Sequence, residues 1–383
     1  MRRTVFNEDH EDFREMVASF LTREVVPHFD GWEKEGRIPK HVYRQMAELG
    51  ILGMAIDEQY GGGGQSSYKY SAILTETSVG LGVSMGALRV HMDIATPYLL
   101  EYCNDEQKSR WLPKVAAGEM MLAIAMTEPG AGSDLAGIST SATREDDVYV
   151  LRGSKTFITG ALNADSFIVV ARTSPATADN RRGGLSLFVV DAGISGLTVG
   201  PNFEKLGLKS QDTAELFFDN VRVPLDCLLG EEGQAFGYLS HNLPQERLSI
   251  ALSSLTAART AIDLTAEHVR ERKAFGRSLS AFQNTKFVLA SCATDVAAGQ
   301  AFIDSALEAH HRGELTAVDA AKLKLFCAEL QGRVVDQCLQ LFGGYGYMAE
   351  YPIARMYADA RVTRIYGGTS EIMKTIIAKS LNL

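Results

Sequence analysis

The apolar residues of this 383-residue chain change their spacing twice, and this double change limits the fold more than any single motif does. Up to about residue 119, and again after residue 233, apolar residues recur at helical spacing. Between these regions the spacing becomes two, and the segments are rich in Val, Ile, Phe, Thr and Tyr. We therefore predict an α+β fold with an N-terminal helical domain (residues 1–119), a middle antiparallel β-sheet domain (120–233) and a C-terminal four-helix bundle (234–383).

The individual elements follow from the same periodicity and from Gly and Pro residues at their ends. Helices are predicted at residues 7–28, 40–49, 68–100 (two packed helices), 105–117, 236–271, 281–311, 317–342 and 353–359. Strands are predicted at residues 121–126, 148–159, 167–172, 185–191, 197–199 and 213–223. A ligand site is expected where the helical and β blocks meet.

Composition excludes several classes of protein. Hydrophobic residues make up 46% and charged residues 22%, which is the balance of an ordinary globular protein. A net charge of −9, without a Lys/Arg-dense stripe, argues against nucleic acid as a partner. We expect no membrane span and no signal peptide, because no apolar run is long enough and the first ten residues are charged. Five cysteines without CxxC spacing favour a reduced, cytoplasmic setting and no metal site.

One turn, which we call the first glycine turn, occupies residues 125–137 with the sequence AMTEPGAGSDLAG. Pro129 starts it, and Gly130 and Gly132 let main-chain N–H groups approach a ligand without Cβ atoms in the way. Thr127 and Ser133 place hydroxyls on either side. This pattern suits a phosphate or the edge of a planar ring, although by itself it is equally typical of a tight strand-to-loop turn.

Two further glycine-rich segments lie in the C-terminal region. The second glycine turn, residues 340–347 (QLFGGYGY), breaks a helix with three glycines, and the closing loop, residues 364–371, reads RIYGGTSE. The first and second glycine turns resemble the two sequence signatures of the acyl-CoA dehydrogenase family of FAD flavoenzymes, in the right order, and the closing loop is similar to the family as well. The resemblance covers nearly the whole chain and includes the RKAFG segment at residues 272–276.

The resemblance implies a role for each residue that matches a motif of the family. It places one set of residues at the FAD of their own subunit, a second set at the FAD of a neighbouring subunit and a third set at the substrate. The residues expected at the flavin in the same subunit are Met126, Thr127, Ser133, Phe157, Ile158, Thr159, Thr369 and Glu371. Those expected to reach the FAD of a neighbour are Arg272, Phe275, Gln283, Gln340, Gly343 and Gly344, and those expected at the substrate are Ser133, Arg247, Tyr366 and Gly368.

The sequence departs from the commonest family pattern at the catalytic base. Most relatives carry Glu immediately before the Gly-Thr of the closing loop, but this chain has Gly367 there. A smaller group, the long-chain and isovaleryl-type dehydrogenases, has its Glu on a helix of the bundle, just before an Arg. Glu246, in the segment LPQERL, stands at the matching place. The alternative for Glu246 is an ordinary surface carboxylate paired with an Arg.

The expected chemistry is α,β-dehydrogenation of an acyl-CoA to the trans-2-enoyl thioester. Glu246 would take the α-proton, N5 of FAD would take the β-hydride, and the Gly367 N–H would donate to the thioester oxygen. The resemblance also implies a homotetramer and an electron-transfer flavoprotein or similar acceptor. Three alternatives stay open: a carrier-protein thioester as substrate, a flavin N-hydroxylase or nitrososynthase, and a non-catalytic helical assembly. Acyl chain length, branching, the acceptor and the pathway are not determined by the sequence.

Overall fold

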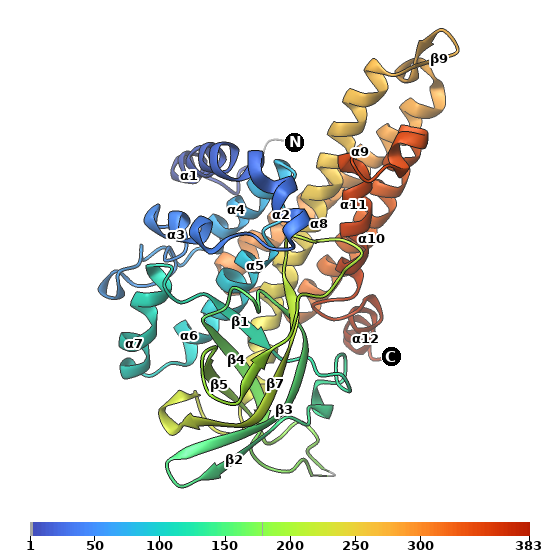
Figure 1. The fold of residues 1–383 in the computed structure, drawn as a ribbon. Helices are drawn as coiled ribbons and strands as arrows, with labels where there is room; N and C mark the ends of the chain where they lie inside the picture. The colour runs from blue at the N-terminus through green and yellow to red at the C-terminus, as the bar shows by residue number, and fades with distance from the viewer. Residues whose placement is uncertain (1–2, 178) are drawn as a thin grey trace.

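The computed structural model describes residues 3–177 and 179–383, and it shows helices, a β-sheet and helices in chain order (Figure 1). The N-terminal helices are α1 (Glu8–Phe20), α2 (Phe29–Glu35), α3 (Lys40–Glu48), α4 (Tyr68–Gly80), α5 (Gly86–Arg89), α6 (Thr96–Tyr102) and α7 (Asp105–Ala116). The single helix predicted over residues 7–28 is α-helical to Phe20 and continues as a π-helix, Leu21–Val25, and a 3₁₀ turn, Val26–His28, in which Pro27 has no N–H to donate. A π-helix, η4 (Val90–Ala95), leads directly into α6.

The middle domain is one sheet built from β1 (Leu122–Ala125), β2 (Ser141–Glu145), β3 (Val148–Thr159), β4 (Ser166–Arg172), β5 (Leu185–Asp191), β6 (Leu197–Val199), β7 (Thr213–Pro224) and β8 (Leu228–Leu229). Its order is β6-β7-β3-β2-β4-β5-β8, and β1 pairs with β4. The predicted antiparallel arrangement holds for most pairs but is wrong for two. β1 runs parallel to β4, and β2 makes one parallel pair with β4. Along the chain, the antiparallel pair β2–β3 comes between β1 and β4, so β4 runs in the same direction as β1 and β2.

The C-terminal domain is a bundle of α8 (Ala235–Glu271), α9 (Gln283–His311) and α10 (Ala317–Phe342), with α11 (Pro352–Ala360) packed on α10 and α8, and α12 (Ser370–Ser380) packed on α10. The 37-residue helix α8 packs against α4, α9 and α10, so it belongs to both helical domains. A short hairpin, β9 (Lys273–Ala274) and β10 (Arg277–Ser278), joins α8 to α9 at the end of the bundle farthest from the sheet (Figure 1). The sequence did not predict α12.

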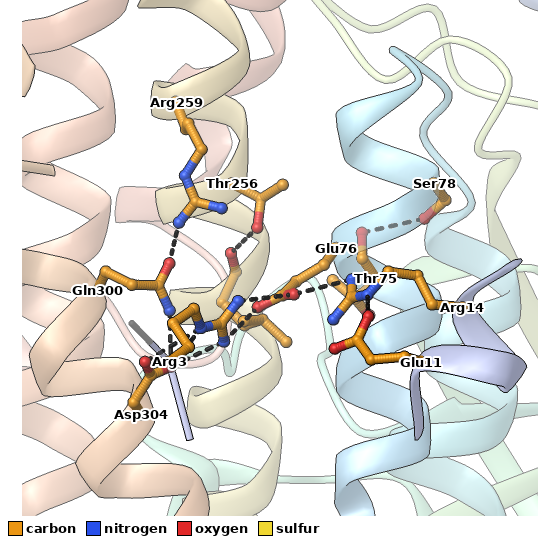
Figure 2. A network of polar contacts seen from close by, with 11 residues as sticks. Arg3, Glu11, Arg14, Thr75, Glu76, Ser78, Thr256, Arg259, Gln300 and Asp304 are labelled. Carbon is orange, nitrogen blue, oxygen red and sulfur yellow. Dashed lines mark hydrogen bonds and ion pairs between the residues drawn. The ribbon is translucent and has the colours of Figure 1, made fainter. Parts of the chain in front are cut away.

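A network of charged side chains fixes the start of the chain to both helical domains (Figure 2). Arg3 bonds Asp304 of α9 and Glu76 of α4, and Arg14 of α1 bonds the same Glu76 at 3.1 Å. Gln300 donates to Asp304 at 2.7 Å. Glu76 is buried, and its two arginine partners are largely shielded from water, so these bonds resist competition from solvent.

Within the described residues, no helix is long and apolar enough to cross a membrane.

Candidate active site

Glu246 lies on α8 and is buried, with only 4% of its surface exposed. The interpretation of Glu246 as a surface carboxylate is therefore wrong. The hydroxyl of Tyr98, on α6, donates a hydrogen bond to its Oε1 at 3.4 Å. Burial raises the pKa of Glu246 to about 7, and the nearby Arg247 guanidinium and the Tyr98 hydrogen bond offset this effect only in part. A carboxyl with this pKa can exchange a proton near neutral pH, as a general base must.

Two buried cations hold the closing loop against the bundle. Arg247 Nε donates to the carbonyl oxygen of Gly367 at 3.4 Å, and Lys324 Nζ, from α10, donates to that of Gly368 at 2.7 Å. Burial and, as a smaller effect, the charge of Arg247 lower the pKa of Lys324 to about 8. Arg247, predicted to bind substrate, thus contacts the loop beside Glu246.

The closing loop has a conformation that glycine adopts readily. Gly367 has φ +63° and Gly368 has φ +90°, in the left-handed region that side chains disfavour. A Cβ atom at Gly367 would overlap Cδ1 of Ile250, while Cγ1 of Ile250 would lie at an ordinary 3.8 Å. Ile250 is one helical turn after Glu246, so the Gly367 main chain lies over the face of α8 that carries Glu246.

The neighbouring Tyr366 is half-buried and lines a small cavity along the same helix. This cavity has a volume of about 70 Å³, and its wall includes Ser253 and Ala257 of α8, Val83 and Met356. Polar groups also reach it, among them the Tyr366 neighbour Thr363. The cavity thus lies along α8 next to the part of the helix that carries Glu246 and Ile250.

A buried ion pair holds the first glycine turn in place. Lys155 of β3 is fully buried, and its Nζ donates to Glu128 Oε1 at 2.8 Å and to the carbonyl oxygen of Met126 at 3.0 Å. Glu128 also accepts from the main-chain N–H groups of Ser139 and Thr140. Burial pushes the pKa of Glu128 upward, but Lys155 and these hydrogen bonds outweigh it and hold the pKa at about 2. The turn is therefore a preformed structure.

The predicted flavin residues of β3 take three different positions. Phe157 has φ +59° at an irregularity in the β3–β7 pairing, which leaves its side chain 67% exposed. Ile158 is buried in the sheet core, so only its main chain can face a ligand. Thr159 Oγ1 accepts from Gln211 Nε2 at 3.4 Å, and Gln211 Oε1 is buried without a hydrogen-bond partner among the described residues. The exposed aromatic ring of Phe157 and the unpaired oxygen of Gln211, which bonds Thr159 two residues along β3, are features that fit a planar, polar-edged ring.

The remaining residues predicted at the flavin of the same subunit lie in or beside the first glycine turn and the closing loop. Thr127 and Met126 are half-buried, and Ser133 is exposed on the first glycine turn. Thr369 caps α12 by accepting the N–H of Ile372 at 3.3 Å. Glu371 is exposed, and its own N–H and the Thr369 hydroxyl lower its pKa. Glu371 is thus a weaker candidate for the base than Glu246, whose pKa is raised.

The residues predicted to serve a neighbour's FAD lie at the other end of α8. Arg272 directly follows α8 and stacks its guanidinium over Tyr345, 5.1 Å from the ring centroid. Phe275, at the tip of the β9–β10 hairpin, is 95% exposed. The other members of this group, all exposed, are Gln283, Gln340, Gly343 and Gly344. Because 26 helical positions separate Glu246 from Arg272, the two groups are roughly 39 Å apart along the helix at 1.5 Å per residue.

Several residues of the site were not identified from the sequence. Tyr98, Ile250 and Lys324 approach Glu246 or the closing loop from elements far away in the chain. The ion pair between Lys155 and Glu128 had one available signal, a lysine in the middle of the strand predicted at residues 148–159. Such a lysine needs a buried partner.

The fold and the site together define a flavoenzyme-type oxidoreductase with a buried carboxylate and preformed glycine loops. The chain belongs to the acyl-CoA dehydrogenase family. Three family models match it: "Acyl-CoA dehydrogenase, N-terminal domain" over residues 7–119, "middle domain" over 123–221 and "C-terminal domain" over 233–382. Together they cover nearly the whole chain.

Individual relatives agree with this assignment. The long-chain specific acyl-CoA dehydrogenase of Sus scrofa mitochondria is 43% identical over 99% of this chain and 88% of its own. The crystal structure of an acyl-CoA dehydrogenase from Geobacillus kaustophilus matches with a TM-score of 0.97 and 45% identity over 100% of both chains. A glutaryl-CoA dehydrogenase from Mycobacterium smegmatis, solved in complex with FADH2, matches with a TM-score of 0.88 and 26% identity over 98% of this chain and 95% of its own.

These comparisons confirm the predicted family, the fold class and an oxidoreductase, and at the level of the family they confirm FAD as the cofactor. The non-catalytic alternative does not fit a chain that keeps the family's motifs over its full length. The domain boundaries and the roles of individual residues stay predictions.

Proposed function

We propose that this chain uses FAD to dehydrogenate an acyl-CoA at its α and β carbons, with Glu246 as the base. The observation that carries this proposal is a buried carboxyl of near-neutral pKa on the face of α8 that Gly367 covers. Gly367 itself cannot take a proton, so the closing loop supplies main chain and α8 supplies the carboxylate. When bound, FAD supplies the acceptor for the β-hydride.

The chain's own residues make the α-proton removable. Glu246 accepts the α-proton, and the Gly367 N–H donates to the thioester oxygen, which lowers the cost of negative charge developing there. Arg247 and Lys324 fix the carbonyl oxygens of Gly367 and Gly368. The loop is therefore held before substrate binds, so its donors need little reorganisation. Burial of the site excludes water that would otherwise compete for the proton.

The flavin would be shared between subunits. The first glycine turn and Phe157 would contact the ring, Ser133 would also reach the acyl-CoA, and Thr369 and Glu371 would close over the cofactor. Arg272, Phe275, Gln283 and the second glycine turn would hold the far end of a neighbour's FAD. An exposed aromatic side chain such as Phe275 supports an interface at the hairpin. Closed symmetry would then give a homotetramer, a dimer of dimers.

A complementation experiment tests this sharing. Glu246→Gln would inactivate the site of its own subunit, whereas Arg272→Ala would weaken the site of its neighbour. Co-expression of the two variants with different affinity tags should therefore yield mixed oligomers in which one site carries both defects and the other carries none. We expect activity to reappear in doubly tagged material only. Activity that stays absent there, while each variant folds, would contradict sharing between subunits.

The reaction itself is tested by anaerobic reduction of the bound flavin. We expect acyl-CoA thioesters to bleach the flavin absorbance, and Glu246→Gln to slow this by about 10²- to 10⁴-fold while flavin and thioester still bind. Glu371→Gln is the comparison: it removes the other nearby carboxylate, which is expected at the cofactor, and at equal flavin occupancy it should bleach far faster than Glu246→Gln. The opposite pattern would show that Glu246 is not the base. A panel of straight and branched acyl-CoAs, one acyl-carrier-protein thioester, and an amine with oxygen separates the alternative substrates.

We further propose that the electrons pass to an electron-transfer flavoprotein or a similar acceptor, and that the protein works in the cytoplasm. The five cysteines are free, four of them buried, which fits a reducing compartment. Stimulation of turnover by purified electron-transfer flavoprotein tests the acceptor.

A further inference from the structure

The segment that faces Glu246 contains an irregular helix. The π-helix η4 runs from Val90 to Ala95 and continues without a break into α6, which carries Tyr98. A π-helical turn adds a residue to the helix and thereby changes which side chains face a neighbouring helix, and such turns are frequent at functional sites. Here the neighbouring helix is α8.

Three hydrogen bonds join this segment to positions 245, 246 and 249 of α8, at the base and on either side of it. Gln245 Nε2 donates to the carbonyl oxygen of Asp93 at 2.7 Å, and Ser249 Oγ donates to its carboxylate Oδ2 at 2.7 Å. Between these two contacts, the Tyr98 hydroxyl donates to Glu246 Oε1 at 3.4 Å. Asp93 is 3% exposed and Tyr98 is fully buried, so water does not compete for these bonds.

We propose that Tyr98 is a positioning residue for Glu246: its hydroxyl orients the carboxylate toward the closing loop and stabilises the ionised form, while Asp93 docks the Tyr98 helix onto α8. This inference rests on the proposed role of Glu246 as base. Burial raises the pKa of Tyr98 well above its usual value, so the phenol stays protonated and acts as a donor. A donated hydrogen bond favours the charged form of a carboxyl.

The other charged or titratable groups around Glu246 act differently. Arg247, on α8 itself, favours the carboxylate through its charge and bonds the closing loop. Lys324 of α10 bonds Gly368, and Glu371 is exposed in the first turn of α12. The Asp93 carboxylate of η4 accepts from Ser249. Among the described residues, the Tyr98 hydroxyl makes the side-chain hydrogen bond to Glu246.

The experiment compares Tyr98→Phe with Tyr102→Phe. Tyr102 is the matched control, because it lies one turn further along α6, 6.1 Å from the Tyr98 ring, and stacks on Tyr238 instead of bonding Glu246. Single-turnover flavin reduction by one acyl-CoA is measured from acid to alkaline pH. We expect Tyr98→Phe to raise the pKa of the rate profile by about one unit, since a hydrogen bond to a charged group is lost. The rate should fall about tenfold at pH values below the wild-type pKa, and the difference should vanish at pH values above the new pKa.

A second readout does not depend on turnover. Infrared difference spectra recorded during a pH titration without substrate should show a protonated carboxyl band that Glu246→Gln abolishes. In Tyr98→Phe this band should persist to higher pH, and in Tyr102→Phe it should titrate as in the wild type. Substrate KM should change little in either variant, because Tyr98 bonds Glu246 and is not proposed to contact the substrate.

Two results would overturn the inference about Tyr98. One is an unchanged titration of the carboxyl band and of the rate in Tyr98→Phe. The other is a rate loss of the same factor at every pH, which indicates a structural role alone. A separate result, full activity in Glu246→Gln, would remove the proposed function as well, so the two failures can be told apart.

Discussion

Moving the base back to the closing loop should require a second change on α8. We consider the variant Glu246→Gln combined with Gly367→Glu, which removes the carboxylate from α8 and places one where most family members have it. A side chain at position 367 meets Ile250, because the new Cβ would overlap Ile250 Cδ1. Ile250→Val deletes this atom and leaves Cγ1 at 3.8 Å, an ordinary contact.

The expected magnitudes follow from this geometry. A non-glycine residue at φ +63° costs about 1–2 kcal/mol, and overpacking against Ile250 costs about 1–3 kcal/mol more. The double variant should therefore be about 2–5 kcal/mol less stable than Glu246→Gln alone. Adding Ile250→Val removes the overlap at a cost of about 0.5–1.5 kcal/mol for the lost methyl group. Most of the overpacking penalty should thus disappear.

Anaerobic stopped-flow reduction of the flavin and urea unfolding test this series. We expect the triple variant to reduce flavin faster than the double variant and to be more stable, although slower than the wild type because the loop stays strained. Ile250→Val alone controls for the methyl group. The reasoning is refuted if the double variant equals the triple variant in both measurements, since the overlap would then not matter. A folded, flavin-loaded triple variant without any recovery would show that position 367 does not face the α-carbon.

Three other predictions concern pH, the first glycine turn and domain packing. The folded state keeps a proton on Glu246 between the unfolded pKa of 4.5 and the folded pKa of about 7, so stability should fall by about 3 kcal/mol as pH rises through this window; urea midpoints at several pH values should lose this component in Glu246→Gln. Glu128→Ala strands the buried Lys155 charge and should cost about 3–5 kcal/mol and lower the flavin content, read from absorbance and thermal unfolding. Arg3→Ala should destabilise by about 1–3 kcal/mol, whereas Arg23→Ala, at an exposed ion pair, should cost less than about 1 kcal/mol in the same urea titration.

The sequence determined the order of the three domains, because the repeat of apolar residues reports which face of each helix or strand is buried. It also determined the family, since the glycine turns are local segments whose residue types must be kept for the main chain to approach a ligand. Glu246 was identified in the same way, from the missing carboxylate at Gly367 and the Glu-Arg pair on α8. Each of these inferences rests on the residue types within short segments of the chain and on no contact between segments.

The tertiary structure decided what surrounds these residues. Tyr98 and Glu246 are 148 positions apart, and only the packing of α6 on α8 brings them into contact. The pKa of Glu246 depends on its burial, the overlap at Gly367 depends on which atom of Ile250 lies beneath the loop, and the parallel pairing of β1 depends on where β4 returns. A sequence pattern shows that a side chain is apolar or charged, but the environment that sets its pKa and its partners is made by segments distant in the chain.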